Sequence, residues 1–323
     1  MHKLLQTAVQ TKPFAQLQRE LKQKGNTVYL NELVGGALSF YLAAAVAKTA
    51  GLHIVVAEDR DQAAYLMNDL YALLDEKRVL FFPSAYKRSI LYGQEEAQSV
   101  VMRTNAINAI QGLVATDYLV LCTYPEALAE RVVGATQLDE NSVTISCGDA
   151  IKITELVDIL ESLGFERVDF VYEPGQYSVR GGIVDIFSYV ESKPYRLDFF
   201  GDEVDSLRRF EIGNQLSSDK LDSITIIGNV NRSQAGQVSL AAFAGESARY
   251  WFYDADYALR KVDDVRVKYL NQSDEPERAT ELLTSRVELL RDMQSSTLLS
   301  LHNNITERPA TATIQFHTQP QRQ

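Results

Sequence analysis

The chain has 323 residues, a hydrophobic fraction of 46%, a charged fraction of 23% and a formal net charge of −11 at pH 7. These values are typical of a globular protein with about two domains, and they exclude disorder throughout the chain. No apolar run approaches the roughly 18 residues of a membrane-spanning helix, and the N-terminus has no signal-type segment. We therefore expect a cytoplasmic protein without membrane contact.

The charge and the cysteine count exclude further classes of function. An acidic protein is a poor candidate for a large nonspecific DNA-binding face, because phosphate contact needs clustered lysine and arginine. Residues 135–212 hold 16 Asp and Glu against 7 Lys and Arg, a net charge of −9, which suits a protein partner rather than nucleic acid. Two cysteines, Cys122 and Cys147, and four scattered histidines match no metal-site spacing. We expect no metal and no cofactor.

The first 130 residues alternate between strand and helix patterns. Buried-type runs that we expect to be strands are followed by amphipathic or alanine-rich stretches that we expect to be helices. This alternation predicts a mostly parallel, doubly wound sheet. The expected strands are residues 27–33, 53–58, 78–83 and 118–123, and the helices include 37–51, 59–74 and 96–111.

The pattern changes to an α+β type from about residue 133 to 213. A helix over 150–164 is followed by three strand-like runs, with turns at Pro174–Gly175 and Lys193–Pro194. The last run, 195–212, reads as a hairpin with Gly201 and Asp202 at its turn. The three strand-like runs are 166–172, 177–189 and 195–212.

The remaining residues complete the first domain in our interpretation. We expect a strand over 223–230, partly helical structure over 241–262, a long amphipathic helix over 274–301 and a last strand over 310–318. The predicted domains are therefore 1–132 for the first part of an α/β domain, 133–213 for an inserted α+β domain, and 214–323 for the second part of the α/β domain.

The turn after the first strand is where this fold class would bind a nucleotide. A phosphate-binding loop reads GxxxxGK[ST], in which the lysine reaches the phosphates and the hydroxyl holds magnesium. Gly35 and Gly36 keep the turn here and Ser39 keeps the hydroxyl, but Leu38 stands where the lysine should be. We interpret this segment as a degenerate P-loop without catalytic residues, while a noncanonical nucleotide site stays open as the alternative.

The inserted region carries the more specific pattern, an alternating ribbon with few charges. Arg167 and Arg180 lie on neighbouring strands if the turn between them closes, and Ile183 and Phe187 follow on the same ribbon. Two arginines beside an aromatic residue in an acidic lobe are typical of a protein-binding hot spot. The alternative is structural: the arginines pair with Asp169 and Asp185, and the two apolar residues belong to the core.

The segment YEPGQYSVRGGIVDIFSYVESKPYRLDFFGDEVDSLRRFEI (172–212) resembles the UvrB-like module at the N-terminus of bacterial transcription-repair coupling factors, the Mfd family. UvrB carries a similar VRG run followed by a FFDDEI-like hairpin. The match is specific from 164 to 214, and with the element order over 28–130 the resemblance covers nearly the whole chain. Two departures from UvrB favour the coupling factor: the broken P-loop, and a segment after the third strand (83–99) too short for UvrB's DNA-probing hairpin.

The resemblance implies a fold and a function. It implies a degenerate UvrB domain 1-like sheet with an inserted UvrB domain 2-like region that binds UvrA, through Arg167, Arg180, Ile183 and Phe187. Ser178 stands where UvrB has another arginine, so part of the charge contact is weakened or relocated. The further partners would be the motor and RNA-polymerase-binding domains of the full-length factor. We expect no enzymatic activity; the alternatives are a UvrB-like damaged-DNA-binding module and an ATPase half-site.

Overall fold

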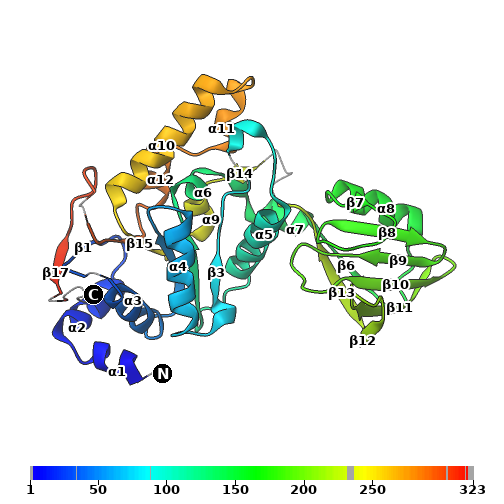
Figure 1. The fold of residues 1–323 in the computed structure, drawn as a ribbon, viewed down its shortest axis with the longest axis horizontal. Coiled ribbons are helices and arrows are strands. Elements are labelled where there is room, and N and C mark those ends of the chain that lie inside the picture. Colours follow the sequence, from blue (N-terminus) through cyan, green and yellow to red (C-terminus); the bar gives the residue numbers. More distant parts are fainter. Residues whose placement is uncertain are drawn as a thin grey trace. The chain divides into compact units, whose positions relative to one another are not determined.

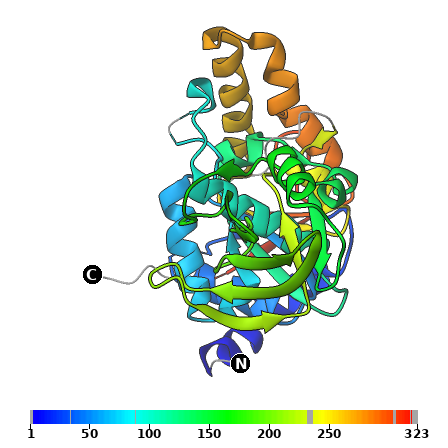
Figure 2. The same ribbon diagram turned by 90° about the vertical axis from the view of Figure 1, so that its right-hand side faces the viewer.

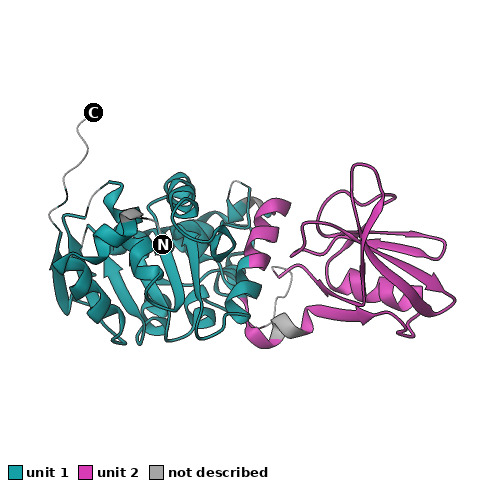
Figure 3. Ribbon diagram, turned by 90° about the horizontal axis from the view of Figure 1, so that it is seen from below, with its two compact units in different colours: residues 1–94, 106–132, 237–323 teal, residues 95–105, 133–236 magenta. Residues whose placement is uncertain are grey.

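The computed structural model describes residues 3–33, 35–87, 89–230, 236–302, 305–316 and 318. The chain divides into two compact units (Figure 3). Unit 1 comprises residues 1–94, 106–132 and 237–323, and unit 2 comprises residues 95–105 and 133–236. Helix α5 (Ala97–Gln111) contributes residues to both, and strands β5 (Val132–Val133) and β14 (Gln237–Val238) lie where the chain passes between the two ranges.

Unit 1 is built on a seven-stranded sheet in the order β17-β1-β16-β15-β2-β4-β3, and every neighbouring pair is parallel. The prediction of an α/β domain with a parallel sheet is therefore confirmed. Its strands are β1 (Thr27–Asn31), β2 (Gly51–Val56), β3 (Val79–Phe81), β4 (Tyr118–Thr123), β15 (Arg249–Phe252), β16 (Thr297–Ser300) and β17 (Ala312–Gln315).

Two of the longer helices of unit 1 begin at a capping aspartate. Asp59 is the N-cap of α4, and its carboxylate accepts a 2.8 Å hydrogen bond from the amide of Gln62. Asp254 caps α10 in the same way. The helices, visible in Figures 1 and 2, are α1 (Lys3–Val9), α2 (Lys12–Leu21), α3 (Ala37–Val46), α4 (Arg60–Tyr71), α6 (Pro125–Ala129), α9 (Leu240–Ala244), α10 (Ala255–Gln272), α11 (Ala279–Leu282) and α12 (Arg286–Asp292).

The predicted long helix over 274–301 is wrong. The segment contains a 3₁₀ turn (Pro276–Arg278), the short helices α11 and α12, and then β16, which lies inside the sheet. Ser285 starts α12 afresh, because its hydroxyl accepts a hydrogen bond from the amide of Glu288. The sequence interpretation also missed β15, a four-residue strand that pairs with both β2 and β16.

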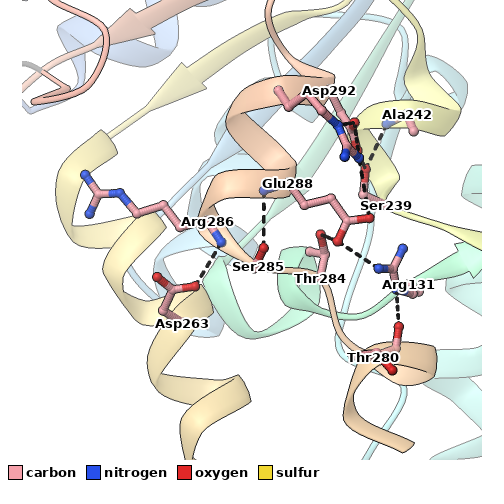
Figure 4. Close-up of polar contacts among 11 residues, drawn as sticks. Arg131, Ser239, Ala242, Asp263, Thr280, Thr284, Ser285, Arg286, Glu288 and Asp292 are labelled. Carbon is pink, nitrogen blue, oxygen red and sulfur yellow. Dashed lines mark hydrogen bonds and ion pairs between the residues drawn. The ribbon is translucent and has the colours of Figure 1, made fainter.

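Polar contacts hold α12 in place, as Figure 4 shows. The guanidinium of Arg131 donates to Glu288 Oε2 at 2.7 Å and to the carbonyl of Thr280 at 2.9 Å. Thr284 donates a second hydrogen bond to Glu288, at 2.9 Å. Ser239, the N-cap of α9, donates to Asp292 near the end of α12. Because these groups are largely shielded from water, the contacts fix the segment that connects β15 to β16.

Unit 2 contains a six-stranded sheet in the order β12-β11-β10-β9-β8-β7. Only β7 and β8 pair in parallel; the other neighbours are antiparallel. A separate antiparallel pair joins β6 and β13. The elements are α7 (Ala135–Glu140), β6 (Ser142–Ser146), α8 (Ile153–Ser162), β7 (Glu166–Arg167), β8 (Gln176–Arg180), β9 (Ile183–Ile186), β10 (Tyr195–Phe200), β11 (Glu203–Phe210), β12 (Ser217–Leu221) and β13 (Ser223–Ile227).

Unit 2 matches the sequence expectations in its hairpin and departs from them in two respects. The predicted hairpin is present as β10 and β11. The predicted boundary at 213 is too early, because β12 pairs with β11 and β13 pairs with β6, so the unit continues to 236. The first strand-like run, 166–172, is a strand only at Glu166–Arg167, and residues 168–175 form a loop.

Candidate partner-binding surface

The segment after β1, which the sequence suggests is a degenerate P-loop, has two side chains buried in the protein interior. Leu38 is buried in the core of unit 1, 3% exposed, so the position that a P-loop lysine would occupy is filled by a core residue. Ser39 is also buried, and its hydroxyl donates a 2.7 Å hydrogen bond to Asp69 on α4. Gly35 keeps a positive φ of 58° and Gly36 precedes α3. The structure thus places Leu38 in the core and engages the Ser39 hydroxyl with Asp69.

Arg167 and Arg180 lie on adjacent parallel strands, β7 and β8. Gly175 permits the turn between them: its φ is +86°, and a Cβ there would lie 2.4 Å from the Tyr189 hydroxyl. Both arginines line one hollow of about 660 Å³, together with Val168, Asp169, Phe170 and Val179. The structure therefore brings the two predicted cations to the same surface of unit 2.

The two arginines differ in their contacts. Arg180 is 34% exposed and forms a 2.5 Å ion pair with Asp185, which is fully buried on β9. Its guanidinium also donates to the carbonyl of Asp169 at 3.1 Å and lies 4.9 Å from the ring centroid of Phe170. Arg167 is exposed, and its side chain makes no hydrogen bond or ion pair with any residue that the structure describes. The sequence left open that the two arginines pair with Asp169 and Asp185. The pair between Arg180 and Asp185 is present, but Arg167 does not pair with Asp169.

Asp185 is shared with a second arginine. Arg196 on β10 lies directly opposite Asp185 and donates to both of its carboxylate oxygens, at 2.7 and 2.9 Å. The hydrogen bond to Asp185 raises the pKa of the Arg196 guanidinium. Arg196 also lies over the ring of Phe210, 4.4 Å from its centroid. A buried carboxylate that accepts from two guanidinium groups fixes the geometry of both.

Phe187 belongs to the core, which corrects the expectation that it offers its side chain to a partner. It is 4% exposed and packs with the buried Val171 and Phe210, against the half-buried Val168 and Ile212. Ile183 is half-buried on β9, opposite Arg180. Of the four predicted contact residues, Arg167 and Arg180 line the hollow, Ile183 stands beside Arg180, and Phe187 supports the surface from within.

The sequence interpretation missed two aromatic side chains on the loop 168–175. Phe170 is 49% exposed and lines the hollow, and Tyr172 is 58% exposed, while Val171 between them is buried. The side-chain oxygen of Gln176 accepts hydrogen bonds from the amides of Tyr172 and Glu173, at 2.9 and 3.0 Å. The sequence VDFVY (168–172) predicts a strand, whereas the structure has a loop in which Val171 is buried between the two exposed rings.

Metal binding and membrane crossing have no support in the described part of the chain. There, no cluster of three or more His, Cys, Asp or Glu side chains could hold a metal ion. His2 and His317 lie outside the described residues. No helix among the described residues is long and apolar enough to cross a bilayer. The surface where Arg167, Arg180 and Phe170 line one hollow is our candidate site, and its chemistry suits an apolar partner group next to a carboxylate.

Comparison with known proteins gives a family context for unit 2. Residues 143–231 match the model of the UvrB interaction domain. The chain is 29% identical to the transcription-repair-coupling factor of Bacillus subtilis over 195 residues, which is 60% of the chain and 16% of that relative. It is 27% identical to the same factor of Escherichia coli over 203 residues, 63% of the chain and 17% of the relative.

A third relative is UvrABC system protein B of Thermotoga petrophila, 26% identical over 207 residues, 60% of the chain and 31% of that protein. The matched regions cover a small part of the coupling factors' length. The matches confirm the resemblance drawn from the sequence, to the UvrB-like module of a transcription-repair coupling factor. The matched domain model also includes β12 and β13, in agreement with the extent of unit 2.

Proposed function

We propose that this UvrB-like chain is a noncatalytic module that recruits UvrA through unit 2 and thereby links a stalled RNA polymerase to nucleotide excision repair. The observation that carries the proposal is the surface around the hollow of unit 2. There Arg167, an exposed arginine whose side chain has no hydrogen-bond or ion-pair partner among the described residues, lies beside an exposed aromatic ring, Phe170. Arginine and aromatic side chains are the residues that most often dominate the affinity of protein interfaces.

The noncatalytic part of the proposal is supported by the loop after β1. A nucleotide-binding loop needs a cation that reaches the phosphates and a free hydroxyl for magnesium. Leu38 is a core residue and the Ser39 hydroxyl is hydrogen-bonded to Asp69. The motor and polymerase-binding parts of a longer factor are what the resemblance implies. The matched relatives are transcription-repair-coupling factors, and the chain spans only a small part of their length.

A calorimetric titration of the chain with purified UvrA tests the proposal. We expect saturable binding of UvrA. We expect no binding when ATP or duplex DNA is titrated in place of UvrA under the same conditions. Hydrolysis of ATP by the purified chain would reject the noncatalytic assignment in favour of an ATPase half-site. Tight, salt-dependent binding to duplex DNA, without binding to UvrA, would favour a damaged-DNA-binding module.

A further inference from the structure

We infer that the two arginines of this surface have different roles, and this inference rests on the proposed UvrA binding. Arg167 supplies the ionic contact to a carboxylate of the partner. Arg180 is a positioning residue that holds the loop 168–175, so that Phe170 and Tyr172 are presented to an apolar group of the partner. The occupant is thus a surface segment in which an acidic side chain stands next to an apolar one.

The hydrogen-bonding capacity of Arg180 is largely used inside the protein. A guanidinium has five N–H donors in a fixed planar arrangement. In Arg180 they reach Asp185, the carbonyl of Asp169 and, at 3.4 Å, the hydroxyl of Ser178. One face of the group lies over Phe170. Few donors remain for a partner carboxylate, whereas Arg167 keeps all of its donors free of the described residues.

The buried carboxylate of Asp185 holds Arg180 in place. Ser178 lies directly opposite Asp185, so Arg180, two residues further along β8, is a diagonal neighbour on the same face of the sheet. Arg196 holds Asp185 from the other side. The carboxylate therefore has a fixed position, and it fixes the Arg180 guanidinium that lies against Phe170 and the loop carbonyl.

The loop itself is held at several further points. The amide of Val168 donates to the Tyr177 carbonyl at 2.9 Å, and the amide of Gly175 donates to the Phe187 carbonyl at 2.7 Å. Val171 inserts into the cluster with Phe187. These contacts turn the side chains of Phe170 and Tyr172 outward. A loop that is ordered before binding loses little conformational entropy when a partner docks, which favours affinity.

The charge of unit 2 identifies the kind of partner group. Residues 135–212 carry a net charge of −9, so a generally acidic partner surface would be repelled. Arg167 is an exposed positive charge within this acidic region, and it lies beside the aromatic ring of Phe170. A single partner carboxylate that reaches Arg167, with an apolar side chain against Phe170, satisfies both features. A broad basic patch on the partner would instead complement the remainder of unit 2.

A double-mutant cycle in UvrA binding tests the different roles. Phe170→Ala should weaken binding at least tenfold, and Tyr172→Ala should weaken it to a smaller extent. Arg180→Lys keeps the charge but loses the planar contact, so it should also weaken binding. If Arg180 acts by holding the loop that presents Phe170 and Tyr172, the double variant Arg180→Lys/Phe170→Ala should lose less affinity than the sum of the two single losses. Arg167→Ala should add its full effect to that of Phe170→Ala and lower the dependence of the dissociation constant on salt.

The matched control is Phe200→Ala, which removes an aromatic ring that is 83% exposed on β10 and does not line the hollow. Its affinity should stay within twofold of wild type.

Melting temperatures of all variants report folding, and the exposed positions Phe170 and Tyr172 keep the test informative if Arg180→Lys unfolds. Wild-type binding that is unaffected by Phe170→Ala, or additive effects of Arg180→Lys and Phe170→Ala, would overturn the inference. Absence of wild-type binding would instead reject the proposed function, on which the inference depends.

Discussion

Substitution of Phe187 distinguishes support of the surface from direct contact with a partner. Phe187 is almost fully buried between Val171 and Phe210. Truncation of a buried phenylalanine to alanine costs about 3–5 kcal/mol in the free energy of unfolding. The neighbouring Val168 and Ile212 are only half-buried, so the site can partly collapse. We therefore expect Phe187→Ala to cost about 3 kcal/mol, at the lower end of that range, and Phe187→Leu roughly 1.5 kcal/mol.

The assay separates the two units. Urea unfolding followed by far-ultraviolet circular dichroism reports the whole chain, while fluorescence of the single tryptophan, Trp251, reports the core of unit 1. Phe187→Ala should shift the circular dichroism transition more than the fluorescence transition. Phe187→Leu should keep UvrA affinity within about threefold, a change of roughly 0.7 kcal/mol. A cost below about 1 kcal/mol for Phe187→Ala, or loss of UvrA binding by a stable Phe187→Leu protein, would refute the supporting role.

Three further predictions concern the nucleotide loop, the turn before β8 and a buried histidine. Leu38→Lys restores the P-loop lysine in sequence but places a charge in the core, so it should destabilise unit 1 by more than about 2 kcal/mol. The variant should bind no ATP in a filter assay. Tight ATP binding would contradict the structure. Gly175→Ala should cost at least about 2 kcal/mol, because it adds a clash to an unfavourable φ, whereas the control Gly181→Ala, with a positive φ but open space, should cost about 1 kcal/mol in the same urea titration. Burial lowers the pKa of His53 to about 3, so stability is complete above the unfolded pKa of 6.5 and falls as the pH drops from 6.5 towards 3. The slope should approach about 1.4 kcal/mol per pH unit and be absent in His53→Gln, and an equal slope in both proteins would disprove this origin.

Much of unit 1 was predictable because its strands β1, β2, β3 and β4 are apolar runs separated by amphipathic helices. The central strands β15 and β16 were not, since each has four residues and follows a stretch with helical spacing. Their strand conformation is stabilised by neighbours on both sides, a tertiary effect that local patterns do not contain. The break before α12 did have a local signal, the Ser285 to Glu288 capping spacing.

The candidate site was predictable in its location and only partly in its chemistry. The predicted turn at Pro174–Gly175 placed Arg167 and Arg180 on neighbouring strands. The structure has these strands as neighbours, but they run parallel and are joined by the loop 168–175. The role of Asp185 depends on register, because it lies opposite Arg196 and diagonal to Arg180. Register between strands is set by packing and turns that the alternation alone does not specify. For the same reason the burial of Phe187 became clear only from its neighbours.

Charge reversal at Arg167 tests the central claim most directly. The measurement is the affinity of the chain for UvrA by calorimetry, for wild type, Arg167→Glu and the control Lys220→Glu, an exposed charge reversal on β12 of the same unit. Our account predicts that wild type and Lys220→Glu bind alike and that Arg167→Glu loses more than about 1.5 kcal/mol, roughly tenfold in affinity. Equal binding by all three proteins, or binding by none, would contradict it.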